Sequence, residues 1–347
     1  MAIRLGIIGL SADKAAWATN AHAVPLKAPP LSEKYTITAV ATSSPESARA
    51  AAKSHGVPEE KAYSSPEAIA NDPDVDMVVV SVKAKKDVFV EWPLANGLQE
   101  AEELAALAKK QGVKTVVGLQ ARLTPSILKA KEIIDSGALG RIITTSIVAS
   151  TSLFQKLDAK NSYINDPKNG VNFITIPTAH ALDPLCFLLG EFKSLNATAA
   201  TNFPTVQFTR PDGTVTEPEK RRFVDSVAVQ GVLESGTTVT FSSTTTTDAT
   251  PGQFEWIIAG EKASLKFEAP VMFIVLHPPA LYQYTPGEGA KWEEVEVVGG
   301  GGGGIGEVYA AFAEGKEGVV DFEEALKRHR MVAAIEKSAA NGTRESY

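Results

Sequence analysis

The sequence has little cysteine, no long apolar run and few clusters of positive charge. Its single cysteine, Cys186, excludes an internal disulfide and fits a reducing compartment. No apolar run approaches the roughly 20 residues that a membrane helix needs. The opening segment MAIRLGIIGL also lacks the basic flank and the cleavage site of a signal peptide. We therefore expect a cytoplasmic or nuclear protein that does not bind membranes.

Positive charge is scarce throughout. The chain has 34 Lys and Arg residues against 41 Asp and Glu residues, a formal net charge of −7. Its basic runs are short, such as KAKK (83–86) and EKRR (219–222). This balance argues against direct binding to nucleic acid, and we expect no metal site.

The length and composition of the sequence fit two globular domains. A chain of 347 residues exceeds one ordinary core and suits two domains of roughly 100–200 residues each. An apolar content of 44% and a charged content of 22% are typical of globular proteins. We place the domains at 1–123 and 124–347.

The first domain alternates strand patterns with helix patterns. Its strands are apolar on both faces, which predicts a parallel sheet covered on both sides by helices, as in doubly wound nucleotide-binding domains. The expected strands are 3–9, 36–42, 76–82, 87–90 and 114–120, and the expected helices are 14–24, 45–56, 65–72 and 98–112.

The link between the third and fourth strands is short for a parallel sheet, in which adjacent strands need a crossover of about a dozen residues. A strand over 76–82 is roughly 23 Å long. The five residues from Val82 to Asp87 reach at most about 18 Å. A parallel return is therefore excluded unless the strands fray. We favour a missing crossover helix, by deletion or by a gap in the recorded sequence, over an antiparallel hairpin, because KAKK lacks the Gly, Asn or Asp of a tight turn.

The second domain begins with a helical pattern over 124–140 and ends with an amphipathic helix over 321–342. Between them, alternating Thr and Val predict a large, mostly antiparallel open sheet. The fold class is thus an α/β Rossmann-like N-terminal domain plus an α+β C-terminal domain. Six glycines at 299–304 predict a flexible connection, because no Gly-Lys-Ser/Thr sequence follows to make a phosphate loop. The expected strands are 141–150, 194–203, 225–235, 237–247, 253–260, 263–269 and 271–276.

Several stretches taken together resemble the Gfo/Idh/MocA oxidoreductase family, over essentially the whole chain. They are IRLGIIGLS (3–11), DMVVVSV (76–82) and GLQARLTP (118–125). Within the family, VEWPL (90–94) and NGVNFITIPTAHALD (169–183) resemble the fungal galactose-pathway repressors, a group of dinucleotide-binding regulators without dehydrogenase chemistry.

The resemblance implies a bound NAD or NADP in the cleft between the domains. In the repressor group it also implies a regulatory protein partner and a role in transcription regulation of galactose metabolism. The alternative is an NAD(P)-dependent oxidoreductase that acts on a sugar or small carbonyl compound with an altered proton donor. We also expect a homodimer formed through the open sheet of the second domain.

The glycine fingerprint of a dinucleotide site is incomplete. G-x-G-x-x-G lets the backbone approach the pyrophosphate at a helix N-terminus, but Gly9-Leu10-Ser11-Ala12-Asp13-Lys14 keeps only the first glycine. A purely structural turn is the alternative, although Ser11 can supply a hydroxyl and a backbone N–H. After the second strand, Thr42-Ser43-Ser44 replaces the acidic residue that binds the ribose of NAD. NADP is therefore admissible, and Ser44 as a plain helix cap is equally open.

A tryptophan replaces the expected proton carrier. In dehydrogenases of the family a lysine in the sequence EKP moves the proton, and Trp92 occupies that position. Indole can donate a hydrogen bond but cannot cycle a proton near neutral pH. Trp92 is either a flat wall beside the nicotinamide or a buried aromatic that fills space, and Pro93 allows a cis peptide that would re-aim the ring.

The second catalytic element, DxGxHxxD in the family, is also altered. Ile176 replaces the leading aspartate, whereas His180 and Asp183 remain. His180 is either an acid in an altered reduction or a packing residue. Because both the lysine and the aspartate are replaced, we favour the regulator over the enzyme.

The resemblance also assigns the site. Gln120 and Arg122 follow the fifth strand, where family members line the cofactor cleft, although a surface salt bridge is the alternative for Arg122. His180 is the candidate catalytic residue. The candidate cofactor-binding residues are Gly9, Leu10, Ser11, Ala12, Trp17, Ser43, Ser44, Ser81, Val82, Glu91, Trp92, Gln120 and Arg122.

Overall fold

The computed structural model describes the chain except for residues 1, 15, 80–85, 251 and 299–303. The described residues form two compact units. The first combines 1–95, 99–123 and 302–326, and the second combines 96–98, 124–301 and 327–347. The segment 302–326 thus lies in the first unit, although the sequence alone gave no reason to separate it from the second domain.

The first unit is built on a parallel sheet of six strands in the order β3-β2-β1-β4-β5-β6. The order reverses between β1 and β4, which is the arrangement of a doubly wound Rossmann-like domain. The α/β prediction is therefore confirmed for this unit. The strands are β1 (Ile3–Ile8), β2 (Tyr35–Ala41), β3 (Ala62–Tyr63), β4 (Met77–Val79), β5 (Asp87–Glu91) and β6 (Thr115–Gly118).

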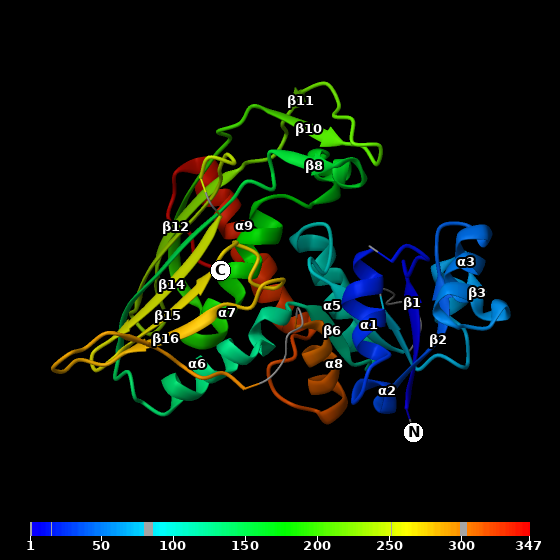
Figure 1. Cartoon of the computed structure of the whole chain (residues 1–347), viewed down its shortest axis with the longest axis horizontal. Helices are drawn as coiled ribbons and strands as arrows, with labels where there is room; N and C mark the ends of the chain where they lie inside the picture. The colour runs from blue at the N-terminus through cyan, green and yellow to red at the C-terminus, as the bar shows by residue number, and fades with distance from the viewer. Residues whose placement is uncertain (1, 15, 80–85, 251, 299–303) are drawn as a thin grey trace. The chain divides into compact units, whose positions relative to one another are not determined.

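Helices cover both faces of this sheet (Figure 1). On one face, α8 (Ile305–Glu314) packs Ile305, Val308 and Tyr309 against strand residues such as Ile7 and Phe89. On the other face, Ile69 packs against Val78. The remaining helical segments of the unit are η1 (Thr19–Ala23), α1 (Val24–Leu26), α2 (Leu31–Lys34), α3 (Pro45–His55), η2 (Glu59–Lys61), α4 (Pro66–Ala70), α5 (Leu98–Gln111) and η3 (Gln120–Leu123).

Strands β4 and β5 pair in parallel, with Met77 opposite Asp87. The antiparallel hairpin, the alternative that we did not favour, is therefore wrong. The described part of β4 has three residues, the last of which is Val79. From Val79 to Asp87 the chain has 87 − 79 = 8 peptide steps, which reach about 27 Å. Parallel pairing requires a return of only about 7 Å along the strand and about 5 Å across it. The question of a missing crossover falls on residues 80–85, outside the described residues.

The second unit contains a sheet of eight strands in the order β17-β16-β15-β14-β7-β13-β12-β9, in which only β7 and β13 pair in parallel. The prediction of a large, mostly antiparallel sheet is therefore confirmed. The strands are β7 (Ile142–Thr151), β9 (Phe192–Ala200), β12 (Ser226–Leu233), β13 (Thr238–Thr245), β14 (Gln253–Gly260), β15 (Ser264–Ala269), β16 (Ala280–Tyr284) and β17 (Trp292–Glu294).

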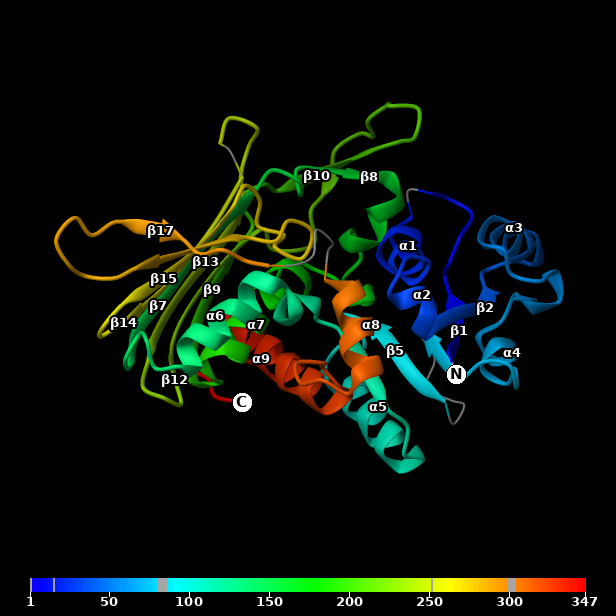
Figure 2. The same ribbon diagram turned by 60° about the horizontal axis from the view of Figure 1, so that its bottom comes forward.

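Three helices lie along one face of this sheet: α6 (Pro125–Asp135), α7 (Ala179–Leu189) and the part of α9 (Phe322–Asn341) that belongs to the unit (Figure 2). A small separate sheet has the order β11-β10-β8, with β8 (Lys156–Asp158), β10 (Thr205–Thr209) and β11 (Glu219–Lys220). Short helical segments precede α7: η4 (Ala159–Asn165), η5 (Pro167–Asn169) and η6 (Ile174–Thr178). None of the helices in the described ranges is long and apolar enough to cross a lipid bilayer.

The strand expected over 271–276 is a turn, so this prediction was wrong. The backbone N–H groups of Leu276 and His277 both donate to the carbonyl of Phe273, at 3.0 Å and 3.1 Å. Met272 and Ile274 are buried nonetheless. A short apolar run that packs into a core has the same composition whether it is extended or turned, and periodicity cannot separate the two.

The second unit contains a buried histidine that should make its stability depend on pH. Burial lowers the pKa of His329, in α9, from 6.5 to about 4. Between these values the unfolded chain binds more protons than the folded chain, so the free energy of unfolding should fall by about 3 kcal/mol as the pH drops from about 6.5 to about 4. Urea unfolding at a series of pH values should show this slope, and His329→Gln should flatten it. The same change at the exposed His277 is the control; an equal slope in all three proteins would contradict the assignment.

Candidate functional site

The candidate cofactor residues of the first unit gather at one edge of its sheet. In a parallel sheet the carboxyl ends of all strands point to the same edge, and ligands bind where the strand order reverses. The loops that follow β1, β2, β5 and β6 carry Gly9, Ser43, Trp92 and Gln120. The N–H of Gly9 donates to the carbonyl of Ala41 at 2.8 Å, which joins the first two loops.

Gly9 adopts a backbone conformation that favours glycine, with φ of +86°, and a Cβ there would meet no described atom within 4 Å. The open space lies where a pyrophosphate approaches in a dinucleotide site. The side chain of the next residue, Leu10, is fully buried in the core. The carbonyl of Ser11 accepts from Nε2 of His55 at 2.8 Å, so α3 fixes the loop from the side. Ala12 is exposed.

The polar residues after β2 form a helix cap. The Oγ of Ser44 accepts from the N–H of Ser47 at 3.2 Å, and the N–H of Ser44 donates to the Oγ of Ser47 at 3.2 Å. This reciprocal pair is a capping box for α3. The capping role that the sequence left open is therefore present, whereas Ser43 is exposed and available to a ligand.

Glu91 joins two aromatic groups at the carboxyl end of β5. Its Oε1 accepts from the indole N–H of Trp17 at 3.0 Å and lies 2.6 Å from Nε2 of His22. The Nδ1 of His22 lies 2.8 Å from the hydroxyl of Tyr309. His22 and Tyr309 are buried, whereas Trp17 is 44% exposed. Sequence analysis singled out Trp17 and Glu91 but missed His22 and Tyr309, because no sequence signal links residues 287 positions apart.

Trp92 is buried, with 6% of its surface exposed, and its peptide bond to Pro93 is cis, as the sequence allowed. Strand β6 leaves room for the preceding residue, Glu91, by having a glycine, because a Cβ on Gly118 would lie 2.4 Å from Oε2 of Glu91. Burial of Trp92 fits the space-filling alternative, and the role as a wall beside nicotinamide stays a prediction.

Gln120 and Arg122 are both buried within η3. The Oε1 of Gln120 has no hydrogen-bond partner among the described residues. Gly304, with φ of +78°, allows close packing here, because a Cβ would lie 2.9 Å from Cγ of Gln120. Arg122 pairs with Glu324 at 3.4 Å, so it forms a salt bridge, but one in which the guanidinium is buried rather than on the surface.

The altered histidine motif belongs to the second unit. Ile176 lies half-buried in η6, and His180 lies half-buried in the first turn of α7. Asp183 is fully buried, with Oδ1 3.8 Å from Nε of Arg328, and Arg328 also binds Glu191. Asp183 thus helps to hold α7 against α9. The other candidates, Ser81 and Val82, lie outside the described residues.

Three features of the first unit are compatible with the binding of a dinucleotide. The turn at Gly9 leaves open space for phosphates, and the buried Oε1 of Gln120 is a free acceptor among the described residues. The three residues directly after β2, Thr42-Ser43-Ser44, have no carboxylate to repel a 2′-phosphate. NAD and NADP both satisfy these conditions. Within the described ranges, no group of three or more His, Cys, Asp or Glu side chains could hold a metal ion.

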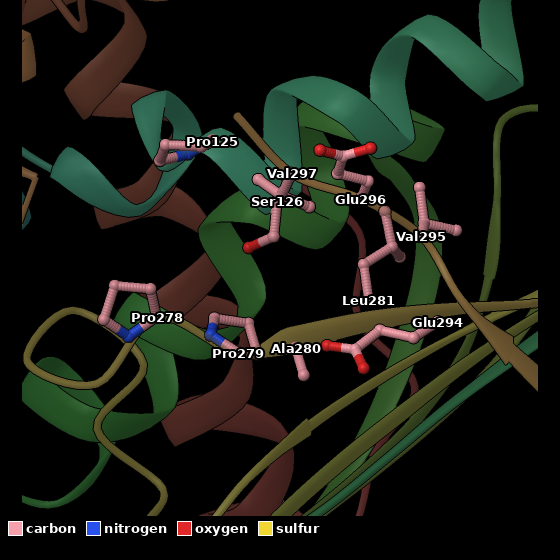
Figure 3. A pocket seen from close by; sticks show the side chains of 10 residues that line it. All are labelled: Pro125, Ser126, Pro278, Pro279, Ala280, Leu281, Glu294, Val295, Glu296 and Val297. Atoms are coloured by element: carbon pink, nitrogen blue, oxygen red, sulfur yellow. The ribbon is translucent and has the colours of Figure 1, made fainter. Parts of the chain in front are cut away.

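The second unit contains a further cavity of about 540 Å³ that sequence analysis did not predict (Figure 3). It lies between the first turn of α6 and the edge of the large sheet. The hydroxyl of Ser126 is buried there and has no hydrogen-bond partner among the described residues. Such a volume is large enough for a small molecule. The lining residues are Pro125, Ser126, Pro278, Pro279, Ala280, Leu281, Glu294, Val295, Glu296 and Val297.

Two family models match the chain. Residues 3–119 match an oxidoreductase family with an NAD-binding Rossmann fold, and residues 125–269 match the C-terminal domain of Gal80p.

Among curated proteins, a dehydrogenase named aclE from Aspergillus oryzae is 42% identical, over 99% of this chain and 98% of its own. That alignment has 364 positions, so at least 364 − 347 = 17 of them face no residue of this chain. The galactose/lactose metabolism regulatory protein of Kluyveromyces lactis is 28% identical, over 81% of this chain and 67% of its own.

Among solved structures, a super-repressor mutant of Gal80p from Saccharomyces cerevisiae has a TM-score of 0.89 at 25% identity, over 100% of this chain and 98% of its own. The same fold occurs in a levoglucosan dehydrogenase solved with NADH and L-sorbose, with a TM-score of 0.82 at 20% identity, over 99% of each chain. The chain therefore belongs to the Gfo/Idh/MocA oxidoreductase family, with a C-terminal domain of the Gal80 type.

Proposed function

We propose that this protein is an NAD(P)-dependent oxidoreductase that acts on a sugar or another small carbonyl compound. The observation that carries the proposal is the 42% identity with a named dehydrogenase over nearly the whole length of both chains. The regulatory relatives are 27–28% identical over 81% of this chain. Because the dehydrogenase is the more similar of the two, we favour the oxidoreductase over the regulator, which the sequence alone had favoured. The dinucleotide would lie at the carboxyl edge of the parallel sheet, against Gly9 and Gln120.

Hydride transfer between an alcohol and a carbonyl also requires the transfer of a proton, and Trp92 cannot provide it. We assign that step to His180, because imidazole can give and take a proton near neutral pH. His180 is half-buried in the first turn of α7, so it is shielded but not sealed from solvent.

A second function, that of a regulator, is favoured by Trp92 and Ile176, which replace the two family residues that move the proton. In this function the site binds the dinucleotide without turnover, and the protein acts through a regulatory protein partner. The identity with the galactose/lactose regulatory proteins supports it. A cytoplasmic or nuclear location is compatible with both functions and stays a prediction.

The two functions differ in turnover. The purified protein should be mixed with reduced NAD or NADP and a panel of sugars and aldehydes, and with the oxidised cofactors and the matching alcohols. Sustained consumption of cofactor supports the oxidoreductase, and saturable binding without turnover supports the regulator. The double variant Trp92→Lys with Ile176→Asp should gain activity if these positions align with the family's lysine and aspartate.

We further propose that the large sheet of the second unit forms a homodimer interface. Residues along its strands alternate between buried and exposed, and Ile143 and Val148 of β7 are 46% and 43% exposed. Covering apolar side chains of this kind stabilises association between two copies of one face. Sedimentation at micromolar concentration should show a dimer, and Val148→Arg should shift it towards monomer. A wild-type protein that is only monomeric would contradict the proposal.

A further inference from the structure

A chain of hydrogen bonds in the first unit links an exposed aromatic ring to the buried core. It runs from Trp17 through Glu91 and His22 to Tyr309, over distances of 3.0 Å, 2.6 Å and 2.8 Å. Glu91, His22 and Tyr309 have no part in the proton transfer assigned to His180.

The chemistry of the groups sets the direction of each bond. A carboxylate can only accept, so Nε2 of His22 carries the proton that it donates to Glu91. In the neutral ring Nδ1 is then an acceptor, which suits the Tyr309 hydroxyl as donor. Burial raises the pKa of Tyr309 well above its usual value, so this hydroxyl keeps its proton. Each donor in the chain therefore has an acceptor, and the two buried rings hold one orientation.

At the exposed end of this series of hydrogen bonds, Glu91 holds Trp17 in place. Oε1 of Glu91 accepts from both His22 and the indole, while Oε2 is confined against Gly118. Phe89 stacks on Tyr309 at 5.1 Å and supports the buried end. The indole is thus held by its N–H at the carboxyl end of β5, with 44% of the residue exposed. An aromatic face that is held in place binds a planar ring without the cost of being ordered.

We propose that His22 and Tyr309 are positioning residues, which hold Glu91 and through it keep the indole of Trp17 as a fixed surface for one of the planar rings of the dinucleotide. This inference rests on the proposed binding of a dinucleotide. In this role neither His22 nor Tyr309 needs to touch the ligand.

The test compares two buried tyrosine hydroxyls. Tyr309→Phe removes the bond to His22 and keeps the ring. Tyr35→Phe is the matched control, because its hydroxyl donates at 2.7 Å to the carbonyl of Tyr309 and its ring lies 5.2 Å from that of Tyr309, but it is not part of the chain to Trp17. Tyr309→Phe should weaken dinucleotide binding about threefold to tenfold, the loss of one net hydrogen bond, and Tyr35→Phe should leave it unchanged.

A second measurement needs no dinucleotide. Trp17 is the most exposed of the four tryptophans, so acrylamide quenching of fluorescence, corrected with Trp17→Phe versions of each protein, reports on its mobility. Quenching of Trp17 should increase in Tyr309→Phe and in His22→Gln, but not in Tyr35→Phe. Equal quenching in all variants would overturn the positioning role. Failure of the wild-type protein to bind NAD(H) or NADP(H) would instead overturn the proposed function.

Discussion

Replacing Gly9 by aspartate should weaken binding of NAD(H) or NADP(H) by about 100-fold or more relative to asparagine at the same position. Both residues tolerate the positive φ of Gly9 better than most, and they have nearly equal volume. They differ by one negative charge placed where the pyrophosphate would lie. At a separation of about 5 Å and an effective dielectric constant of about 20, that charge costs about 3 kcal/mol, or a factor of about 100 in affinity.

The comparison of Gly9→Asp with Gly9→Asn separates charge from backbone strain. Both variants should unfold at similar urea concentrations, because the two side chains have nearly the same shape and a Cβ at position 9 meets no described atom within 4 Å. Dissociation constants from fluorescence titration provide the measurement. Equal affinity of the two variants would place the phosphates away from this turn.

Replacing His180 by glutamine should lower kcat/KM by about 100-fold to 10,000-fold, the usual contribution of a general acid or base. The dissociation constant of the dinucleotide should not change, because the residue is assigned to proton transfer alone. The matched control is His277→Gln, which makes the same change at an exposed position of the second unit.

A pH profile gives this second prediction an independent readout. In carbonyl reduction, where His180 would act as an acid, the wild-type rate should fall as the pH rises and the imidazole loses its proton. The His180→Gln variant should lose this dependence. Full activity in His180→Gln would show that His180 does not transfer the proton. The proton would then have to come from another group.

The Rossmann-like unit could be predicted from the sequence because its strands are apolar on both faces and alternate with helices that end at glycines, such as Gly56 after α3. The length of β4 could not be predicted in this way. Apolar residues continue past Val79 in the sequence, into residues 80–82, which lie outside the described residues.

The connection after β4 still matters for the account. At least 17 positions of the alignment with the Aspergillus oryzae dehydrogenase have no counterpart in this chain. A crossover helix between adjacent parallel strands has about that length. Sequencing the transcript that encodes residues 76–90 would show whether the natural chain contains such a segment.

The candidate site was predicted only where its residues lie close to a recognisable motif. Gly9, Glu91 and Gln120 follow strands, so the topology of a parallel sheet brings them to one edge. His22 and Tyr309 lie in helical stretches whose pattern indicates only that one face is buried. Their contact depends on α8 returning to the first unit from the far end of the chain, a tertiary arrangement that local patterns do not encode.

Binding of a nicotinamide dinucleotide underlies both proposed functions, and an equilibrium titration tests it most directly. NADH and NADPH should be added to the purified protein, with excitation of tryptophan and detection of nicotinamide emission. The account predicts saturable emission with one site per chain, which Gly9→Asp largely removes and Gly9→Asn largely retains. A folded wild-type protein that shows no saturable signal with either dinucleotide would contradict it.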